Sequence, residues 1–274
     1  MTENSLTYIA NAGVMLKLDG KKILIDPLTT PGNVLYLDTE QAARVALLTN
    51  AAPYDHVDVV LVTHHHRDHF HAEGILALLE AQPGAHLVSS PEVIRRLKAA
   101  SVSTLSGEAF ESGSSTVPGS DRWTAVELEL YEHTELTCNG VTLQIFRTLH
   151  DGEDYADVTN LMFVIKSPSM VVAQLGDSAP ADINFEGILS KIGSPLDVVI
   201  ANFPYIAIPA ARKLVERCLT PASLAVLHFP DPTGEAARWT EVAKKSFARV
   251  KEIYLPTVLL ETLGETVFLP MVAD

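Results

Sequence analysis

The stretch LVTHHHRDHFHAEG, residues 61–74, holds five of the ten histidines in this chain of 274 residues. Within it, His64, His66, Asp68 and His69 form the pattern His-x-His-x-Asp-His. Directly after a strand, residues two apart still point the same way, so His64 and His66 can converge on one ion, while Asp68 and His69 can face a second. Imidazole and carboxylate groups are ligands that zinc takes in proteins. The pattern therefore predicts a metal site at the end of a strand.

The apolar run VDVVLVT, residues 57–63, leads into this loop and predicts a strand that is covered on both faces. Strand-like and helix-like segments alternate in the first and last thirds of the chain, whereas the middle third has closely spaced antiparallel strands. We expect strands at 6–18, 22–25, 57–63, 86–89, 126–130, 136–137, 141–147, 160–166, 170–174, 197–204, 223–230, 253–255 and 266–269, and helices at 39–48, 72–80, from 91 onward, 209–218 and 235–250. This order predicts a layered α/β fold.

Length, composition and charge restrict the number of domains, the class of partner and the location of the protein. A chain of 274 residues that is 47% hydrophobic predicts a single domain over residues 1–274. A net charge of −14 argues against a partner with a phosphate backbone and suits a small molecule better. Cys138 and Cys218 match no zinc or redox spacing, so we expect reduced thiols in a cytoplasmic protein. There is no basic leader and no apolar stretch of about 18 residues, so we expect neither secretion nor a membrane span.

Five landmarks in order give the chain a resemblance to the metallo-β-lactamase-fold hydrolases. They are KKILIDP with Asp26, the His-x-His-x-Asp-His loop, IFRTLHDG with His150, VVAQLGDSAP with Asp177, and LAVLHFP with His228. The last three also end apolar runs, which independently places them at the sheet edge where α/β proteins bind ligands. The resemblance implies a four-layer αββα sandwich of two mixed β-sheets flanked by helices.

The same resemblance implies a metal centre with two divalent ions. His64, His66 and His150 would hold one ion, Asp68, His69 and His228 the other, and Asp177 would bridge both. Asp26 would lie behind a metal-bound histidine and orient it. Zinc is the expected metal, and manganese or iron can occupy the same ligands. With such a centre we expect hydrolysis of an ester, lactone or phosphodiester, in which Asp68 and Asp177 are catalytic and no Ser or Cys nucleophile is needed.

Among subfamilies, the chain looks most like the small lactonase-like and phosphodiesterase-like hydrolases, the group that includes ascorbate-6-phosphate lactonase. Many of that group carry a histidine where this chain has Asn11. The motif has His66 in place of a glutamate, which disfavours the diiron oxygen-reducing branch. Two other functions stay open: a nucleic-acid phosphodiesterase of the RNase Z type, and a metal-holding sensor without activity. We expect a small anionic substrate, and neither nucleic acid nor membrane as partner.

The remaining candidates lie around the motif and beyond it. Arg67 alternates with the ligands along the loop, and we expect it to point away from the metals, with substrate contact as its alternative role. Tyr205, in the loop NFPYIAIP, is either an oxyanion or phosphate donor or an aromatic lid packed on Phe203. His71 opens the next helix and is expected to be a surface or capping residue. The segment 101–122, rich in Ser, Thr, Gly and Pro, predicts a surface loop that could cover the site.

Overall fold

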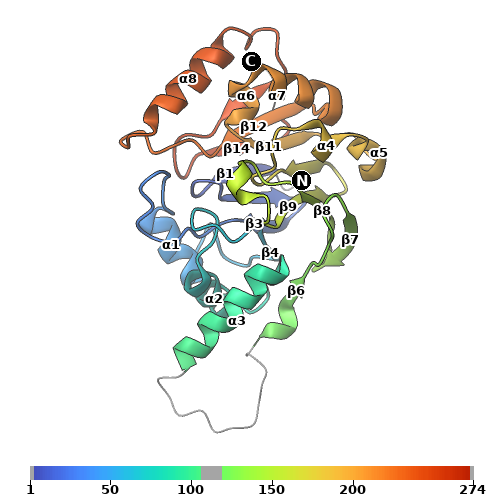
Figure 1. The fold of residues 1–274 in the computed structure, drawn as a ribbon. Helices are drawn as coiled ribbons and strands as arrows, with labels where there is room; N and C mark the ends of the chain where they lie inside the picture. Colours follow the sequence, from blue (N-terminus) through green and yellow to red (C-terminus); the bar gives the residue numbers. More distant parts are fainter. Residues whose placement is uncertain (1–2, 106–118, 272–274) are drawn as a thin grey trace.

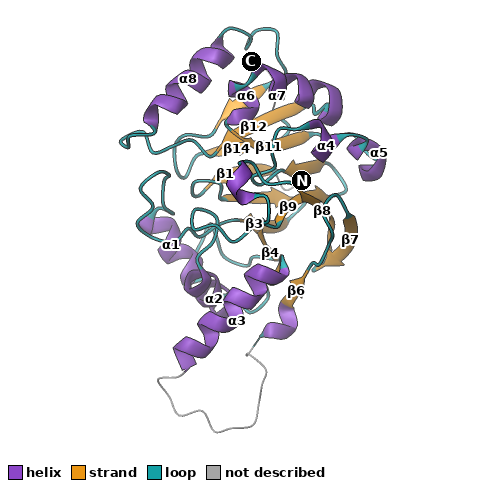
Figure 2. Ribbon diagram, in the orientation of Figure 1, coloured by secondary structure: helices purple, strands orange, loops and turns teal. Residues whose placement is uncertain are grey.

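Two β-sheets of seven strands each lie face to face in the computed structural model, which describes residues 3–105 and 119–271 (Figures 1 and 2). One has the strand order β14-β1-β2-β3-β4-β5-β6. Its strands are β1 (Ser5–Tyr8), β2 (Val14–Leu18), β3 (Lys21–Ile25), β4 (Val59–Val62), β5 (His86–Ser89), β6 (Trp123–Ala125) and β14 (Thr266–Phe268). The other has the order β13-β12-β11-β10-β9-β8-β7. Its strands are β7 (His133–Cys138), β8 (Val141–Thr148), β9 (Asn160–Lys166), β10 (Val171–Gln174), β11 (Val198–Asn202), β12 (Ser223–Leu227) and β13 (Thr257–Leu259).

Helices cover the outer face of each sheet, which gives the four layers that were predicted (Figure 1). The first sheet carries α1 (Gln41–Leu48), α2 (Ala72–Ala81) and α3 (Pro91–Leu105). The second carries α4 (Asp182–Phe185), α5 (Ile188–Ile192), α6 (Pro204–Ala207), α7 (Pro209–Leu214) and α8 (Ala237–Ala248). Single turns η1 (Ser120–Arg122) and η2 (Glu153–Tyr155) and the π-turn η3 (Val215–Leu219) complete the elements. The fold class is the metallo-β-lactamase αββα sandwich.

The side chains of β4 alternate between two buried faces, which explains why its sequence is apolar throughout. Val59 and Leu61 pack into the core between the two sheets, and Val60 and Val62 pack against the helices on the outer face. Because successive side chains of a strand point to opposite faces, a strand buried on both faces has no solvent-exposed position for a polar side chain. The prediction of a doubly covered strand before the histidine loop is therefore confirmed.

Each sheet is half antiparallel and half parallel, and the parallel halves fix where the loops gather. In the first sheet Ile25 pairs with Leu61 across parallel strands β3 and β4, so the chain leaves both strands at the same edge. In the second sheet Asn202 pairs with Leu227 across parallel strands β11 and β12. The antiparallel run from β7 to β10 confirms the predicted meander of the middle third.

Three local predictions were wrong, and a fourth was wrong in part. The strand expected at 6–18 is two antiparallel strands, β1 and β2, joined by residues 9–13. The alternating segment 126–130 is not a strand, because β5 ends at Ser89 and only the bond from Val126 N–H to the Ser89 carbonyl continues the pairing of β6. The strand expected at 253–255 lies at β13 instead, where Leu224 and Val226 of β12 offer a parallel partner. Of the loop expected at 101–122, residues 101–105 continue helix α3 and 120–122 form η1, while 106–118 lie outside the described residues. Among the described residues, no helix is both long and apolar enough to cross a membrane.

Candidate metal centre

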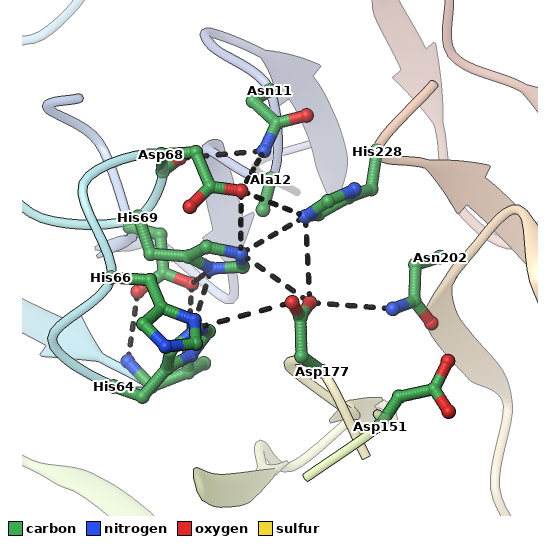
Figure 3. A network of polar contacts seen from close by, with 12 residues as sticks. Asn11, Ala12, His64, His66, Asp68, His69, Asp151, Asp177, Asn202 and His228 are labelled. Carbon is green, nitrogen blue, oxygen red and sulfur yellow. Dashed lines mark hydrogen bonds and ion pairs between the residues drawn. The ribbon is translucent and has the colours of Figure 1, made fainter. Parts of the chain in front are cut away.

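Seven of the predicted site residues meet at the edge where β4, β8, β10 and β12 end. Figure 3 labels six of them, all except His150. The loop after β4 supplies His64, His66, Asp68 and His69. His150 lies two residues beyond β8, Asp177 three residues beyond β10, and His228 directly after β12. The sequence folds this way because each residue follows an apolar strand that must be buried, and the parallel strands end on the same side.

The first donor group contains His64, His66, His150 and Asp177. His64 Nε2 lies 3.1 Å from His66 Nδ1 and 3.3 Å from His150 Nε2. Two ligand atoms of a tetrahedral ion lie about 3.4 Å apart when each metal–ligand distance is about 2.1 Å. The spacing of these nitrogens therefore fits a single divalent ion.

The second donor group contains Asp68, His69 and His228. His69 Nε2 and His228 Nε2 are 3.1 Å apart, and His228 Nε2 lies 3.2 Å from Asp68 Oδ2. This group again combines imidazole and carboxylate atoms at the spacing expected around one ion.

Asp177 faces both donor groups with different oxygens. Its Oδ2 lies 3.6 Å from His150 Nε2 and 3.9 Å from His64 Nε2. Its Oδ1 lies 3.3 Å from His69 Nε2 and 3.5 Å from His228 Nε2. A carboxylate placed in this way can contribute one oxygen to each of two ions.

Hydrogen bonds on the far side of three imidazoles fix which nitrogen faces the centre. His69 Nδ1 donates to Asp26 Oδ2 at 2.8 Å, and His150 Nδ1 donates to the Asp151 carbonyl at 2.6 Å. The Thr63 hydroxyl donates to Asp26 at 2.7 Å, so its lone pair is free for His64 Nδ1 at 3.0 Å. A ring that donates from Nδ1 presents the lone pair of Nε2, which is the form that binds metal. Asp26 lies behind His69 and accepts a hydrogen bond from its Nδ1.

Two buried asparagines hold the carboxylates of the centre. Asn11 donates from Nδ2 to Asp68 Oδ2 at 3.1 Å, and its backbone carbonyl accepts the His228 N–H at 3.0 Å. Asn202 donates from Nδ2 to Asp177 Oδ1 at 3.3 Å. Sequence reasoning missed both roles, although Asn11 was noted where relatives carry histidine and Asn202 ends a buried strand.

Burial and neighbouring charge divide the histidines into two kinds. Burial lowers the pKa of His64 well below its ordinary value and that of His66 to about 4, so both rings are neutral at pH 7. Burial also acts on His69, but the carboxylates of Asp177 and Asp68 outweigh it and raise the pKa of this ring well above the ordinary value. Without a metal, the second donor group therefore holds a proton that the first does not.

A cavity of about 530 Å³ opens onto the centre and contains Arg67 in its lining. The Arg67 side chain is exposed and forms no hydrogen bond or ion pair with any described residue. Two tyrosines that the sequence did not single out, Tyr36 and Tyr155, also line the cavity. The Tyr36 ring packs edge-on against His228 with centroids 4.4 Å apart.

Tyr205 requires a correction, because it is fully buried and does not line the cavity. Its hydroxyl donates to the Ser178 carbonyl at 2.9 Å, and its ring packs against Phe185, not Phe203. The hydroxyl is therefore occupied and cannot serve a substrate. His71 occupies the N-cap position of α2 but forms no capping bond with its side chain.

A family model described as "Beta-lactamase superfamily domain" matches residues 5–203. The chain belongs to this superfamily. Among proteins with curated functions, none matches the chain. The family match ends before β12, so His228 lies beyond it.

Solved structures of this superfamily fold resemble the chain at low sequence identity. A structure from Veillonella parvula, described as a possible metal-dependent hydrolase, is 18% identical with a TM-score of 0.64, over 98% of this chain and 100% of that one. A metallo hydrolase of the archaeon Ignicoccus hospitalis is 17% identical with a TM-score of 0.59, over 97% and 98% of the two chains. A diiron β-hydroxylase of Streptomyces venezuelae is 15% identical with a TM-score of 0.58, over 97% of this chain but 54% of that one.

Proposed function

We propose that this member of the superfamily is a hydrolase with two divalent ions, zinc first among them, that cleaves a small anionic ester, lactone or phosphodiester. One observation carries the proposal: Asp177 lies between two complete donor groups and turns a different oxygen toward each. Divalent ions held there would supply Lewis acidity and a hydroxide nucleophile at neutral pH.

The chain's own residues supply the remaining functions. Asp68 Oδ2 is held by Asn11 and faces His228, whereas Oδ1 forms no hydrogen bond within the described part of the chain. Because Asp68 also lines the cavity, Oδ1 is available to accept a proton from the nucleophile. Asp177 keeps the two donor groups at a fixed separation.

The cavity supports a small substrate with negative charge. Its volume, about 530 Å³, lies within the range of roughly 300–1,000 Å³ for small-molecule sites. Arg67, at this cavity, has a guanidinium that pairs with no residue in the described part of the chain, and guanidinium groups bind carboxylates and phosphates with two parallel hydrogen bonds. A long polyanion would meet a surface of net charge −14 outside the cavity.

The test compares small substrates with a polymer. We expect metal-loaded protein to hydrolyse a generic phosphodiester or a sugar-type lactone far faster than RNA or single-stranded DNA, to lose this activity with chelator, and to depend only modestly on salt. Efficient and salt-sensitive cleavage of RNA would favour the nuclease instead. Metal binding with no turnover of any ester would favour the sensor.

A further inference from the structure

We infer that Asp151 and Asn202 form a subsite of the cavity that binds a hydrogen-bond donor of the substrate, namely a hydroxyl or an ammonium group. This inference rests on the proposed function, in which the metal centre binds the ester group of the substrate. The subsite would bind a second group of the same substrate. The two residues belong to different elements: Asp151 follows ligand His150, and Asn202 ends β11. Both line the cavity.

The orientation of the Asn202 amide is fixed by Asp177. A carboxylate only accepts hydrogen bonds, so the Asn202 amino group must face Asp177 Oδ1, at 3.3 Å, and the carbonyl must face the other way. Asn202 is 5% exposed, and its Oδ1 has no hydrogen-bond donor among the described residues. A buried acceptor without a donor is costly, which indicates that a partner group is missing from this position.

Asp151 supplies a second acceptor on the same side of the centre. Its backbone carbonyl accepts from His150 Nδ1 at 2.6 Å, which fixes the backbone at this point. Within residues 3–105 and 119–271, its Oδ1 accepts one hydrogen bond, from the N–H of the next residue, Gly152, at 3.1 Å. No described Lys or Arg pairs with this carboxylate. Figure 3 draws Asp151 and Asn202 on the same side of Asp177 in this view, and both residues line the cavity.

The chemistry of the missing group follows from these acceptors. Two oxygens that only accept hydrogen bonds select a donor, and hydroxyl and ammonium groups share that property. Arg67, in the same cavity, selects an anion. The substrate class is therefore a small ester or lactone that carries a negative group and, separately, a hydroxyl or an ammonium group.

Binding of three matched phosphonates to the zinc-loaded protein tests the subsite without relying on turnover. The probes are propylphosphonate, 3-hydroxypropylphosphonate and 3-aminopropylphosphonate, and calorimetry measures their dissociation constants. We expect one or both functionalised probes to bind about tenfold or more tightly than propylphosphonate, because a hydrogen bond to a charged group is worth about that factor. A larger gain for the hydroxyl probe identifies a polyol-like substrate, and a larger gain for the amino probe an ammonium-bearing one.

Variants of Asp151 test whether this residue causes the preference for the hydroxyl or amino probe over propylphosphonate. Asp151→Leu removes both acceptor oxygens but keeps the backbone carbonyl that holds His150, so the preference should fall to about twofold or less. Asp151→Asn is the milder variant: it keeps the size of the side chain and should weaken the amino probe more than the hydroxyl probe. Asp154→Leu and Asp154→Asn are the matched controls, because Asp154 is exposed, lies in the same loop and does not line the cavity.

Three results would overturn the subsite: equal affinity of the three probes, binding of none of them, or a preference that survives in both Asp151 variants. Hydrolysis is assayed on the same protein and separates the two proposals. A probe preference in a protein that cleaves no ester would reject the proposed function and leave the subsite. Ester cleavage without a probe preference would reject the subsite alone.

Discussion

Replacement of Asp26 by asparagine should weaken metal binding by the second donor group while leaving the fold intact. Asp26 is fully buried and accepts three hydrogen bonds: from Thr63 N–H at 2.8 Å, from the Thr63 hydroxyl at 2.7 Å and from His69 Nδ1 at 2.8 Å. Its φ of 46° lies in the left-handed region, which asparagine adopts more readily than most residues. Asp26→Asn therefore changes hydrogen bonding with little added backbone strain.

An asparagine cannot satisfy all three donors, whichever way its amide turns. If its amino group faces His69 Nδ1, the ring must accept there and carry its proton on Nε2, the nitrogen that faces Asp177. If the amide turns over, the amino group meets the Thr63 N–H. One unsatisfied buried donor costs about 1–3 kcal/mol of unfolding free energy, and loss of such an orienting partner lowers metal affinity about 10- to 100-fold.

Zinc titration of the metal-free protein by calorimetry measures this loss, and thermal unfolding measures the stability. Asp58→Asn is the matched control, because Asp58 lies just before β4, at the end opposite the metal centre. Its pair with Lys21 at 2.8 Å is partly exposed and is worth about 1 kcal/mol or less. If Asp26→Asn bound two zinc ions as tightly as the native chain, the orienting role of Asp26 would be wrong.

Three further predictions concern the centre itself. Asp177→Ala should lower turnover more than any cavity substitution, because Asp177 faces both donor groups; turnover and bound metal are measured together, and near-native turnover would reject the dinuclear scheme. Because neighbouring carboxylates raise the pKa of His69, binding of the second ion should release a proton and should weaken by about tenfold per pH unit once the pH lies below that raised pKa, whereas the first ion should show little proton release; titrations in buffers of different ionisation enthalpy measure both. Gly176→Ala should lower the free energy of unfolding by about 2 kcal/mol or more, since a Cβ would lie 2.5 Å from Asn160 Oδ1 at a φ of +56°. Gly264→Ala isolates the backbone contribution, because φ is +82° there and the added Cβ would meet no described residue within 4 Å apart from its chain neighbours; equal losses for the two variants would contradict the steric argument.

The convergence of the donor groups was predictable because apolar strands precede the histidines and acids that form them. Val59–Val62 is apolar at every position, which indicates a strand buried on both faces, and the histidine motif begins two residues later. His228 follows β12, which is likewise buried at every position, whereas His150 follows β8, in which buried apolar residues are interspersed with polar ones. Parallel strands end at the same edge of a sheet. Residues that follow such strands are therefore expected to lie close together even when they are distant in sequence.

The cavity walls were not predictable, because they come from segments without periodicity. Tyr36 lies in a stretch that is neither helix nor long strand, and it forms an isolated β-bridge with Pro230. Hydrogen bonds from side chains fix the path of this stretch, for example from Gly32 N–H to Asp38 Oδ2 at 2.7 Å. For Tyr205 the sequence predicted a donor to the substrate or an aromatic lid, because the residue follows a buried strand. The helical turn α6 instead directs its ring into the core.

The donor groups are held together by buried contacts that do not involve a metal. Asn160, on β9, accepts the Asp177 N–H at 3.0 Å and donates to the Thr148 hydroxyl at 2.8 Å, so it ties the end of β10 to the end of β8. Asp26 ties the end of β3 to Thr63 after β4. The Thr63 carbonyl accepts the Leu161 N–H at 2.9 Å, and this bond joins the two sheets directly beside the centre. Because each ligand loop is anchored to a strand of one sheet and the sheets are joined at this point, the geometry of the donor set follows from the fold, and a bound metal has little conformational entropy left to remove.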